Sequence, residues 1–276
     1  MTVSSEGGCV YVVATPIGNL EDLSPRARRV LAEVAVIACE DTRRTARLCS
    51  RFEIATPRLS LHEHNERRRT PALLEKLAAG ASVALVSDAG TPLVSDPGSR
   101  FVAAAIEAGY RVVPVPGPSA VLAALVASGL PSDAFSFFGF LPRKGRARET
   151  RLADLRRAPG ALVLFEAPGR VRETLRDLNE ALGERRVAVA RELTKAFEEI
   201  VRGRLGSLAI EEPRGEVTIV VEAAEAPEPE MPSEAEIDRL LEEGLSPRDA
   251  ARELALSRGI PRSRAYALVL RRAGGR

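Results

Sequence analysis

Tryptophan is absent from this chain, and cysteine, histidine, methionine and lysine are scarce. The cysteines (Cys9, Cys39 and Cys49) are odd in number and lack C-x-x-C spacing, which argues against a disulfide framework or a zinc site and favours a reducing compartment. The longest apolar run, residues 120–127, is shorter than the roughly 18 residues that span a bilayer, and no signal-peptide pattern opens the chain. We therefore expect a cytoplasmic protein without membrane association.

An excess of charge of one sign is also missing. Lys+Arg 40 and Asp+Glu 38 leave a formal net charge of +2, so any binding of nucleic acid must come from local clusters. Hydrophobic residues at 45% and charged residues at 28% are typical of globular proteins and exclude disordered, collagen-like and low-complexity chains. The 276 residues suffice for one large or two small domains.

Short β-branched runs alternate with helical patterns, which predicts an α/β fold with a largely parallel sheet. Apolar residues recur at spacings of three and four in residues 25–33, 70–79, 99–108 and 170–182, and glycines follow several of these segments as helix C-caps would. The predicted strands are residues 10–14, 35–39, 83–87, 111–115, 161–165, 187–190 and 217–221.

Three regions are expected along the chain. The Pro-Gly-Pro segment at residues 116–118 predicts a hinge between an N-terminal lobe, residues 1–116, and a second α/β lobe, residues 117–224. Acidic residues with Pro227, Pro229 and Pro232 then predict a linker. It leads into a basic helical appendix, so that residues 225–276 form the third region.

The segments that follow the predicted strands are rich in glycine, proline, small hydroxyls and carboxylates. In open α/β sheets ligands bind beyond the carboxyl ends of the strands, so these segments predict a shared pocket, although each could also be an ordinary turn. Neither a G-x-x-x-x-G-K-[ST] loop nor a G-x-G-x-x-G after the first strand is present. Carboxylates and apolar walls suit a cationic, adenosine-bearing ligand better than a triphosphate.

Several long motifs follow one another without large gaps over residues 9–222. They are residues 11–24 (YVVATPIGNLEDLS), 38–43 (ACEDTR), 60–65 (SLHEHN), 85–98 (LVSDAGTPLVSDPG), 113–120 (VPVPGPSA), 138–142 (FGFLP), 165–168 (FEAP) and 191–195 (RELTK). Together they resemble the ribosomal RNA small subunit methyltransferase I family. The resemblance implies the tetrapyrrole methylase fold, in which two α/β lobes enclose an S-adenosylmethionine cleft. It also implies 2′-O-methylation of a decoding-centre cytidine ribose in 16S rRNA of the 30S subunit by a homodimer, without a metal.

The resemblance also assigns the cofactor-binding residues. By analogy, residues 87–92 and 94–97 would hold the methionine and ribose portions. Asp88 and Asp96 would accept hydrogen bonds from the ribose hydroxyls or the ammonium group, unless they only cap their own turns. The second lobe would supply the opposite wall. The expected contacts are Pro16, Asp88, Ala89, Gly90, Thr91, Pro92, Val94, Ser95, Asp96, Pro97, Pro116, Gly117, Ser119, Ala120, Phe165, Glu166, Ala167 and Ala190.

Methyl transfer to a ribose hydroxyl would benefit from a general base. The oxygen must lie in line, about 3 Å from the methyl carbon, and it is a poor nucleophile while protonated. A carboxylate could act directly, and a lysine beside an arginine could have a lowered pKa. The residues leave the choice open, since each candidate could equally be an ion-pair partner. They are Glu40, Asp41, Glu166, Glu192 and Lys195.

A cationic track for RNA is expected in two places. The first follows the aromatic-rich residues 135–140, which also fit an ordinary buried strand. The second is the tail, where two helices around Gly259 resemble a helix-turn-helix, with a small helical cap as the alternative. The expected RNA contacts are Arg43, His62, His64, Asn65, Arg143, Lys144, Arg146, Arg148, Arg262 and Arg264.

The chain's two histidines, His62 and His64, lie in one H-x-H pattern. No further His or Cys pair completes a ligand set, so we expect substrate contact or loop structure here rather than a metal.

Two other functions stay open at this point: methylation of a small precorrin-type tetrapyrrole, and a non-catalytic role in ribosome assembly. Basic segments favour RNA over a porphyrinoid. Ala14-Thr15-Pro16-Ile17 also stands where tetrapyrrole enzymes carry glycines.

Overall fold

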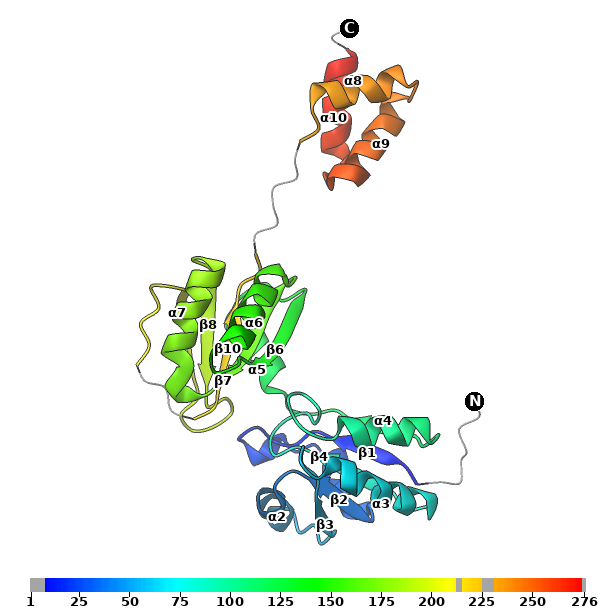
Figure 1. The fold of residues 1–276 in the computed structure, drawn as a ribbon, viewed down its shortest axis with the longest axis vertical. Coiled ribbons are helices and arrows are strands. Elements are labelled where there is room, and N and C mark those ends of the chain that lie inside the picture. Colours follow the sequence, from blue (N-terminus) through cyan, green and yellow to red (C-terminus); the bar gives the residue numbers. More distant parts are fainter. Residues whose placement is uncertain (1–7, 212–214, 225–230, 275–276) are drawn as a thin grey trace. The chain divides into compact units, whose positions relative to one another are not determined.

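The computed structural model describes residues 8–211, 215–224 and 231–274. Its contacts divide the chain into two compact units, residues 1–224 and residues 225–276 (Figure 1). The first unit contains two sheets of five strands each. No helix in the described part of the chain is both long and apolar enough to cross a membrane.

The first sheet is wholly parallel, in the order β3-β2-β4-β1-β5. Its strands are β1 (Val10–Val13), β2 (Val36–Cys39), β3 (Arg58–Ser60), β4 (Val83–Val86) and β5 (Val112–Val115). The central strands β2 and β4 are buried at every residue, as expected of a sheet covered on both faces. Pro114 lies in β5, which is an edge strand of the sheet. Its missing N–H therefore removes no hydrogen bond between neighbouring strands.

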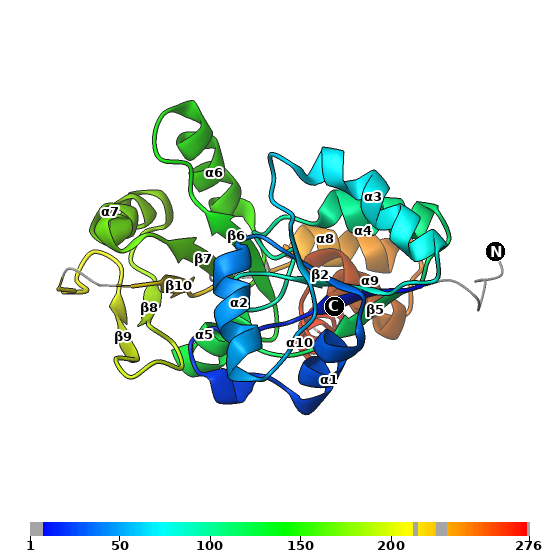
Figure 2. The ribbon, with the colours of Figure 1, turned by 90° about the horizontal axis from the view of Figure 1, so that it is seen from below.

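Helices cover both faces of this sheet (Figure 2). One core cluster joins α1 (Pro25–Glu33) and α2 (Thr42–Arg51) to the sheet, and the other joins α3 (Glu66–Ala78) and α4 (Ser99–Glu107) to it. A short 3-10 turn, Leu20–Asp22, precedes α1. The helix predicted from residue 70 begins at Glu66, so that Pro71 lies inside it rather than in its first turn.

The second sheet differs from the expected parallel arrangement. Its order is β6-β7-β10-β8-β9, and only β6 (Phe135–Phe140) and β7 (Ala161–Glu166) run parallel. The strands β8 (Arg186–Arg191), β9 (Glu199–Arg204) and β10 (Val217–Val221) pair antiparallel. The prediction was wrong here because β8 and β9 follow each other through a short loop, which antiparallel neighbours permit and parallel ones do not.

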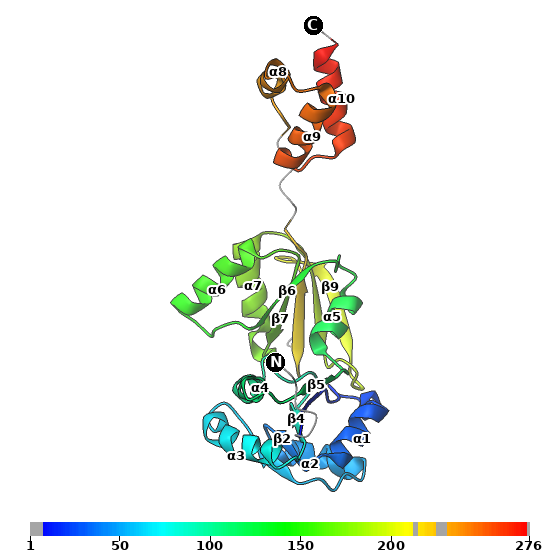
Figure 3. The same cartoon turned by 90° about the vertical axis from the view of Figure 1, so that its right-hand side faces the viewer.

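The second sheet also lies between helices. Figure 3 shows α5 (Ala120–Ser128) on one face and α6 (Arg146–Arg157) with α7 (Val171–Leu182) on the other, with a 3-10 turn, Pro168–Arg170, before α7. Two core clusters fill the two faces, one around Leu164 and Leu178 and one around Ala124 and Val163. The α/β fold with two lobes is confirmed, and each predicted strand is present to within one residue at either end.

The second unit consists of α8 (Glu234–Glu242), α9 (Pro247–Arg258) and α10 (Arg262–Ala273). Ser233 and Ser246 cap α8 and α9, and Gly259 ends α9 with a positive φ of 64°. Ile237, Leu254 and Val269 are buried in its core. The predicted helical appendix is therefore present, whereas Pro227 and Pro229 of the predicted linker lie outside the described residues.

Candidate active site

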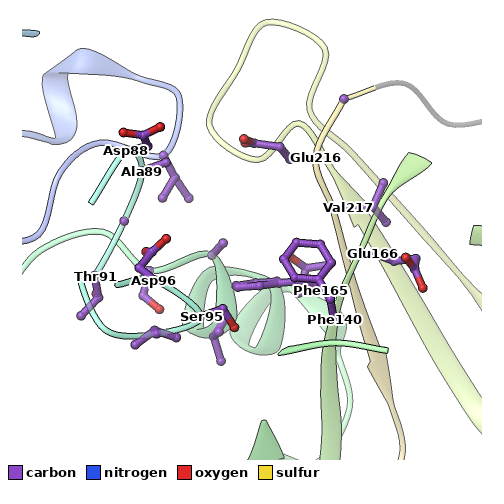
Figure 4. Close-up of a pocket in the computed structure, with 18 of the residues that line it drawn as sticks. Asp88, Ala89, Thr91, Ser95, Asp96, Phe140, Phe165, Glu166, Glu216 and Val217 are labelled. Atoms are coloured by element: carbon purple, nitrogen blue, oxygen red, sulfur yellow. The ribbon is translucent and has the colours of Figure 1, made fainter. Parts of the chain in front are cut away.

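A cavity of about 430 Å³ lies between the two sheets of the first unit (Figure 4). The loops after β1, β2 and β4 and the start of α5 line it from the N-terminal lobe and the connection. The ends of β6 and β7 and the start of β10 line it from the other lobe. Its size falls within the roughly 300–1,000 Å³ of small-molecule sites.

The loop at residues 87–98 forms much of the first wall, in a strained conformation. Leu93 and Ser95 have φ values of 72° and 66°, a region that non-glycine residues rarely occupy. Gly90, at φ 81°, exchanges backbone hydrogen bonds of 2.9 and 3.0 Å with Thr15. The loop is therefore fixed to its neighbour before any ligand arrives.

Three carboxylates gather on this wall: Glu40, Asp88 and Asp96. Burial, and then the nearby charges of Glu40 and Asp88, raise the pKa of Asp96 to about 6. Partial desolvation and the Asp88 carboxylate likewise raise the pKa of Glu40. Only Arg44, 3.5 Å from Asp88, provides an ion pair to the three among the described residues. This wall is thus an acidic surface suited to a cation.

The opposite wall is aromatic. Phe140 and Phe165 line the cavity with their ring centroids 5.6 Å apart (Figure 4). Glu166 also belongs to this wall, but its carboxylate points away from Asp88 and Asp96 and is fully buried. It accepts hydrogen bonds from the Thr174 hydroxyl at 2.6 Å and from the Ala167 N–H at 2.8 Å, and lies 3.4 Å from the Arg170 guanidinium.

Two further acidic residues near this wall share one lysine. Lys195 Nζ lies 2.9 Å from Glu192 Oε1 and 3.0 Å from Glu216 Oε2, and Glu216 lines the cavity. Desolvation lowers the pKa of Lys195, but its hydrogen bonds to the two carboxylates outweigh this and raise it overall. The same lysine lowers the pKa of Glu192. The positive charge of Lys195 therefore compensates the negative charges of Glu192 and Glu216.

These surfaces fit S-adenosylmethionine by charge and shape. Carboxylates on one side can hold a sulfonium, an ammonium group or ribose hydroxyls, and phenylalanine rings on the other offer a face to a purine. A sequence model of the family described as Tetrapyrrole (Corrin/Porphyrin) Methylases matches residues 9–209. This chain belongs to the tetrapyrrole methylase family.

Relatives narrow the position of this tetrapyrrole methylase within the family. It is 49% identical to "Ribosomal RNA small subunit methyltransferase I" of Mesorhizobium japonicum, over 96% of this chain and 87% of that one. It is 46% identical to the protein of the same name from Pseudomonas aeruginosa, over 97% and 98% of the two chains. The chain therefore belongs to the ribosomal RNA small subunit methyltransferase I group.

Solved structures share the fold of this methylase at lower identity. The methyltransferase CobJ has a TM-score of 0.61 and 25% identity, covering 79% of this chain and 95% of that chain. Uroporphyrin-III C-methyl transferase from Thermus thermophilus, solved with S-adenyl homocysteine, has a TM-score of 0.55 and 24% identity, covering 77% and 97%.

The structure brings most of the predicted cofactor residues of the methylase to the cavity. Those that line it are Asp88, Ala89, Gly90, Thr91, Val94, Ser95, Asp96, Ser119, Ala120, Phe165, Glu166 and Ala167. The others do not line it: Pro16, Pro92, Pro97, Pro116, Gly117 and Ala190. Ala190, for example, is buried in the core between α5 and the second sheet.

Sequence reasoning missed some lining residues, notably Ile17, Arg44, Phe140 and Glu216 with its neighbours. Phe140 ends the aromatic run at residues 135–140, and its 56% exposure is the feature that distinguishes it from a core phenylalanine. Glu216 reaches the cavity only because β10 is inserted between β7 and β8, a placement that no local pattern specifies.

Two of the predicted RNA contacts have structural roles instead. Arg148 is 6% exposed, donates to Thr174 Oγ1 at 3.1 Å and pairs with Asp177 at 2.6 Å, so it is not a surface cation. Asn65 is buried and accepts from the His62 N–H at 2.9 Å, closing the turn before α3.

The remaining predicted RNA contacts are accessible. Arg43, His64, Arg143, Lys144, Arg146, Arg262 and Arg264 are exposed, and His62 is half-buried. Within residues 8–211, 215–224 and 231–274, no group of three or more His, Cys, Asp or Glu could hold a metal ion.

Proposed function

We propose that this protein transfers the methyl group of S-adenosylmethionine to the ribose 2′ oxygen of a decoding-centre cytidine in 16S rRNA. The observation that carries the proposal is the acidic and aromatic cavity between two lobes, in a chain 46–49% identical to proteins named ribosomal RNA small subunit methyltransferase I. As a tetrapyrrole methylase it is an S-adenosylmethionine-dependent methyltransferase.

When bound, S-adenosylmethionine supplies a methyl group made electrophilic by the sulfonium. Asp88 and Asp96 provide negative charge at the cavity wall, which favours the cationic donor over the neutral product left after transfer. Phe140 and Phe165 provide an apolar, aromatic surface on the opposite side. The hydrogen bond from Thr91 Oγ1 to the Pro118 carbonyl, 3.1 Å long, ties the first wall to the connection between the lobes.

The test uses 30S subunits from a strain that lacks this ribose methylation, incubated with the protein and methyl-labelled donor. We expect label on the ribose of one 16S cytidine. Label on a precorrin-type tetrapyrrole but not on the subunit would replace the proposal with small-molecule methylation. Binding to the subunit without any label would indicate an assembly factor.

For the RNA surface we propose the exposed cations just before and at the start of α6 (Arg143, Lys144 and Arg146) and at the start of α10 (Arg262 and Arg264). Replacing Arg262 and Arg264 together by alanine should weaken 30S binding about tenfold and reduce the salt slope of the affinity by about 1 for each phosphate that is no longer neutralised. Filter binding at several salt concentrations measures this. Unchanged affinity and slope would remove the second unit from the RNA surface.

We also propose that the protein acts in the cytoplasm as a homodimer on the assembled 30S subunit. Every residue of α5 except Ser128 is apolar, yet Leu122 and Val126 are 51% and 77% exposed. A second copy covering α5 would remove that apolar surface from water. Light scattering of the wild type and of Val126→Glu tests this, since loss of the dimer in the variant alone is the expected result.

A further inference from the structure

A second hollow, of about 530 Å³, lies beside the cofactor cavity, where β2 and β3 end. Both histidines of the chain, together with Glu63 and Arg43, line it. Four residues of the motif at residues 60–65 line it (Ser60, His62, Glu63 and His64), and none of them lines the cofactor cavity.

The two hollows share a wall. Glu40 lines both of them. The Asp41 N–H donates to Asp88 Oδ1 at 3.0 Å, which joins the end of β2 to the acidic wall of the cofactor cavity. The Ser60 hydroxyl donates to the Glu40 carbonyl at 3.4 Å, which joins the ends of β2 and β3. A molecule seated in the second hollow would thus extend toward the cofactor across Glu40.

The side chains of the second hollow suit a nucleotide base. The His62 and His64 rings stand nearly perpendicular, at 68°, with centroids 6.0 Å apart, so a planar ring could stack on one and meet the edge of the other. His62 Nδ1 is buried and has no hydrogen-bond partner among the described residues. Glu63 is exposed and can accept from an exocyclic amino group.

The positively charged Arg43 lies at the rim of this hollow. The Arg43 side chain is 88% exposed and is held by Asp41, with Nε and Nη2 at 3.2 and 3.1 Å from its two carboxylate oxygens. A guanidinium held in this way can meet a backbone phosphate while it stays oriented. The hollow therefore offers groups for a base, and its rim offers one for a phosphate.

We propose that this second hollow is the subsite for the target nucleotide: it takes the unstacked cytosine, and Glu40, on the shared wall, takes the proton of the ribose 2′ hydroxyl. The proposal rests on the proposed function. In the step, the O–H bond breaks and its proton passes to the Glu40 carboxylate. The oxygen forms a bond to the methyl carbon, and the carbon–sulfur bond of the sulfonium breaks, leaving a neutral thioether.

The other candidate bases are already engaged. Asp41 holds Arg43, whose hydrogen bonds lower the pKa of Asp41 to about 2, so it is a weak base. Glu192 and Lys195 are paired with each other and do not line either hollow. Glu166 faces Thr174 and Arg170. Glu40 alone among the candidates lines both hollows, and no side-chain hydrogen bond or ion pair engages its carboxylate in the described structure.

The test of the base subsite compares His62→Ala, His64→Ala and Glu63→Gln with the exposed control Glu75→Gln on α3. The substrates are methylation-deficient 30S subunits that carry cytidine or uridine at the target. Each histidine variant should reduce single-turnover transfer at limiting subunit about tenfold. Glu63→Gln should lower the preference for cytidine over uridine about tenfold, because an amide can also donate to the uracil oxygen.

One further measurement and one further variant distinguish a role in binding the nucleotide from a role in folding. The affinity for S-adenosylmethionine, by calorimetry, should stay within about twofold in the histidine and Glu63 variants, since their loss is confined to the nucleotide. Because half-buried His62 also contributes to folding, exposed His64 provides the second, independent variant. Wild-type rates and wild-type cytidine preference in all three would overturn the base subsite.

Glu40→Gln tests the base. Its single-turnover rate at saturating donor and subunit should fall at least about 100-fold, while the 30S dissociation constant stays within about threefold. A rate within threefold of wild type at saturation would overturn the assignment of Glu40. If the wild type itself labels no 30S cytidine, the proposed function fails, an outcome distinct from variants that match an active wild type.

Discussion

The two walls of the cofactor cavity carry similar numbers of carboxylates but use them differently. On the N-terminal wall, Glu40, Asp88 and Asp96 face one another, and the pKa values of Glu40 and Asp96 are raised. On the other wall, Glu166 lies among Thr174, Ala167 and Arg170. Asp88 has one ion-pair partner, Arg44, and one backbone donor, the Asp41 N–H. No ion pair engages Glu40 or Asp96 among the described residues, so an arriving cation would stabilise their negative charge. Glu166, by contrast, is already paired and stabilises the fold. The carboxylates of the first wall are therefore suited to binding the ligand, whereas Glu166 of the second wall stabilises the fold.

The largest expected effect comes from the scaffold wall. Glu166→Ala removes the buried acceptor of the Thr174 hydroxyl and the charged partner of Arg170, which keeps the Leu141 and Pro142 carbonyls, and it opens a cavity. The free energy of unfolding should therefore fall by about 3 kcal/mol. Urea unfolding followed by circular dichroism measures it. Glu166→Gln, which keeps the shape and one acceptor oxygen, should recover part of the loss. A stability equal to wild type in Glu166→Ala would erase the distinction between the walls.

On the ligand wall, Asp88→Ala should weaken S-adenosylmethionine binding and, because Asp88 also accepts from the Asp41 N–H, should lower the free energy of unfolding by about 1 kcal/mol. Removing a charge-assisted hydrogen bond costs about 1.5–3 kcal/mol, or roughly a tenfold to hundredfold rise in the dissociation constant. Calorimetric titration measures it, with Asp22→Ala, an exposed acid outside the cavity, as the matched control. An affinity unchanged from wild type would remove Asp88 from the cofactor site.

The ionisation of Asp96 should make the stability of the protein depend on pH. Its folded pKa, about 6, lies above the ordinary aspartate value of 3.8, so the folded protein binds an extra proton between these values and is destabilised when the carboxylate ionises above pH 6. Asp96→Asn should stabilise the ligand-free protein by about 1 kcal/mol at pH 8, after allowing for solvent screening of a half-buried group, and by nothing near pH 3. Thermal unfolding at the two pH values tests this.

The same carboxylate should make cofactor binding depend on pH in the opposite sense. Only ionised Asp96 attracts the sulfonium, so the wild-type affinity should fall as the pH drops through 6, by up to about tenfold, and the Asp96→Asn profile should be flatter. Titrations from pH 5 to 8 measure it. Parallel profiles in the two proteins would assign the dependence to another group.

The smallest effect is expected at Lys195. Its partner Glu216 is 66% exposed, and partly exposed ion pairs contribute little, so Lys195→Met should lower the free energy of unfolding by about 0.5–1 kcal/mol. The pKa of Glu192 should rise at the same time, because Lys195 is the main cause of its lowering. Carboxylate titration by NMR measures that shift, and a stability loss as large as that of Glu166→Ala would contradict the ranking.

Local patterns predicted the fold well where the information is local. β-branched runs bounded by turns located most of the strands, and the apolar spacing over residues 25–33 located α1. The charged segment that became β9 was missed because an edge strand exposed on its polar side carries no apolar run. The antiparallel pairing of β10 between β7 and β8 was missed because strand order is decided by long-range contacts.

Among the site residues, too, local sequence motifs located some and failed for others. Sequence motifs located most of the cavity's first wall, since residues 87–98 form one continuous loop after one strand. They failed for Arg148, whose partners Thr174 and Asp177 lie 26 and 29 residues further along the chain. A run of arginines on a helix predicts a solvent-exposed, basic surface. Only the packing of α6 against α7 places one of these arginines, Arg148, in the interior.

The sequence by itself determined most of the strands and helices and their succession along the chain, the loops that carry chemical groups, and membership of the family, because each depends on neighbours along the chain. The tertiary structure alone decided which acids are paired and which stay free, and that a second hollow adjoins the first across Glu40. The physical reason is that a carboxylate's chemistry depends on the charges and burial around it, and those come from residues distant in sequence.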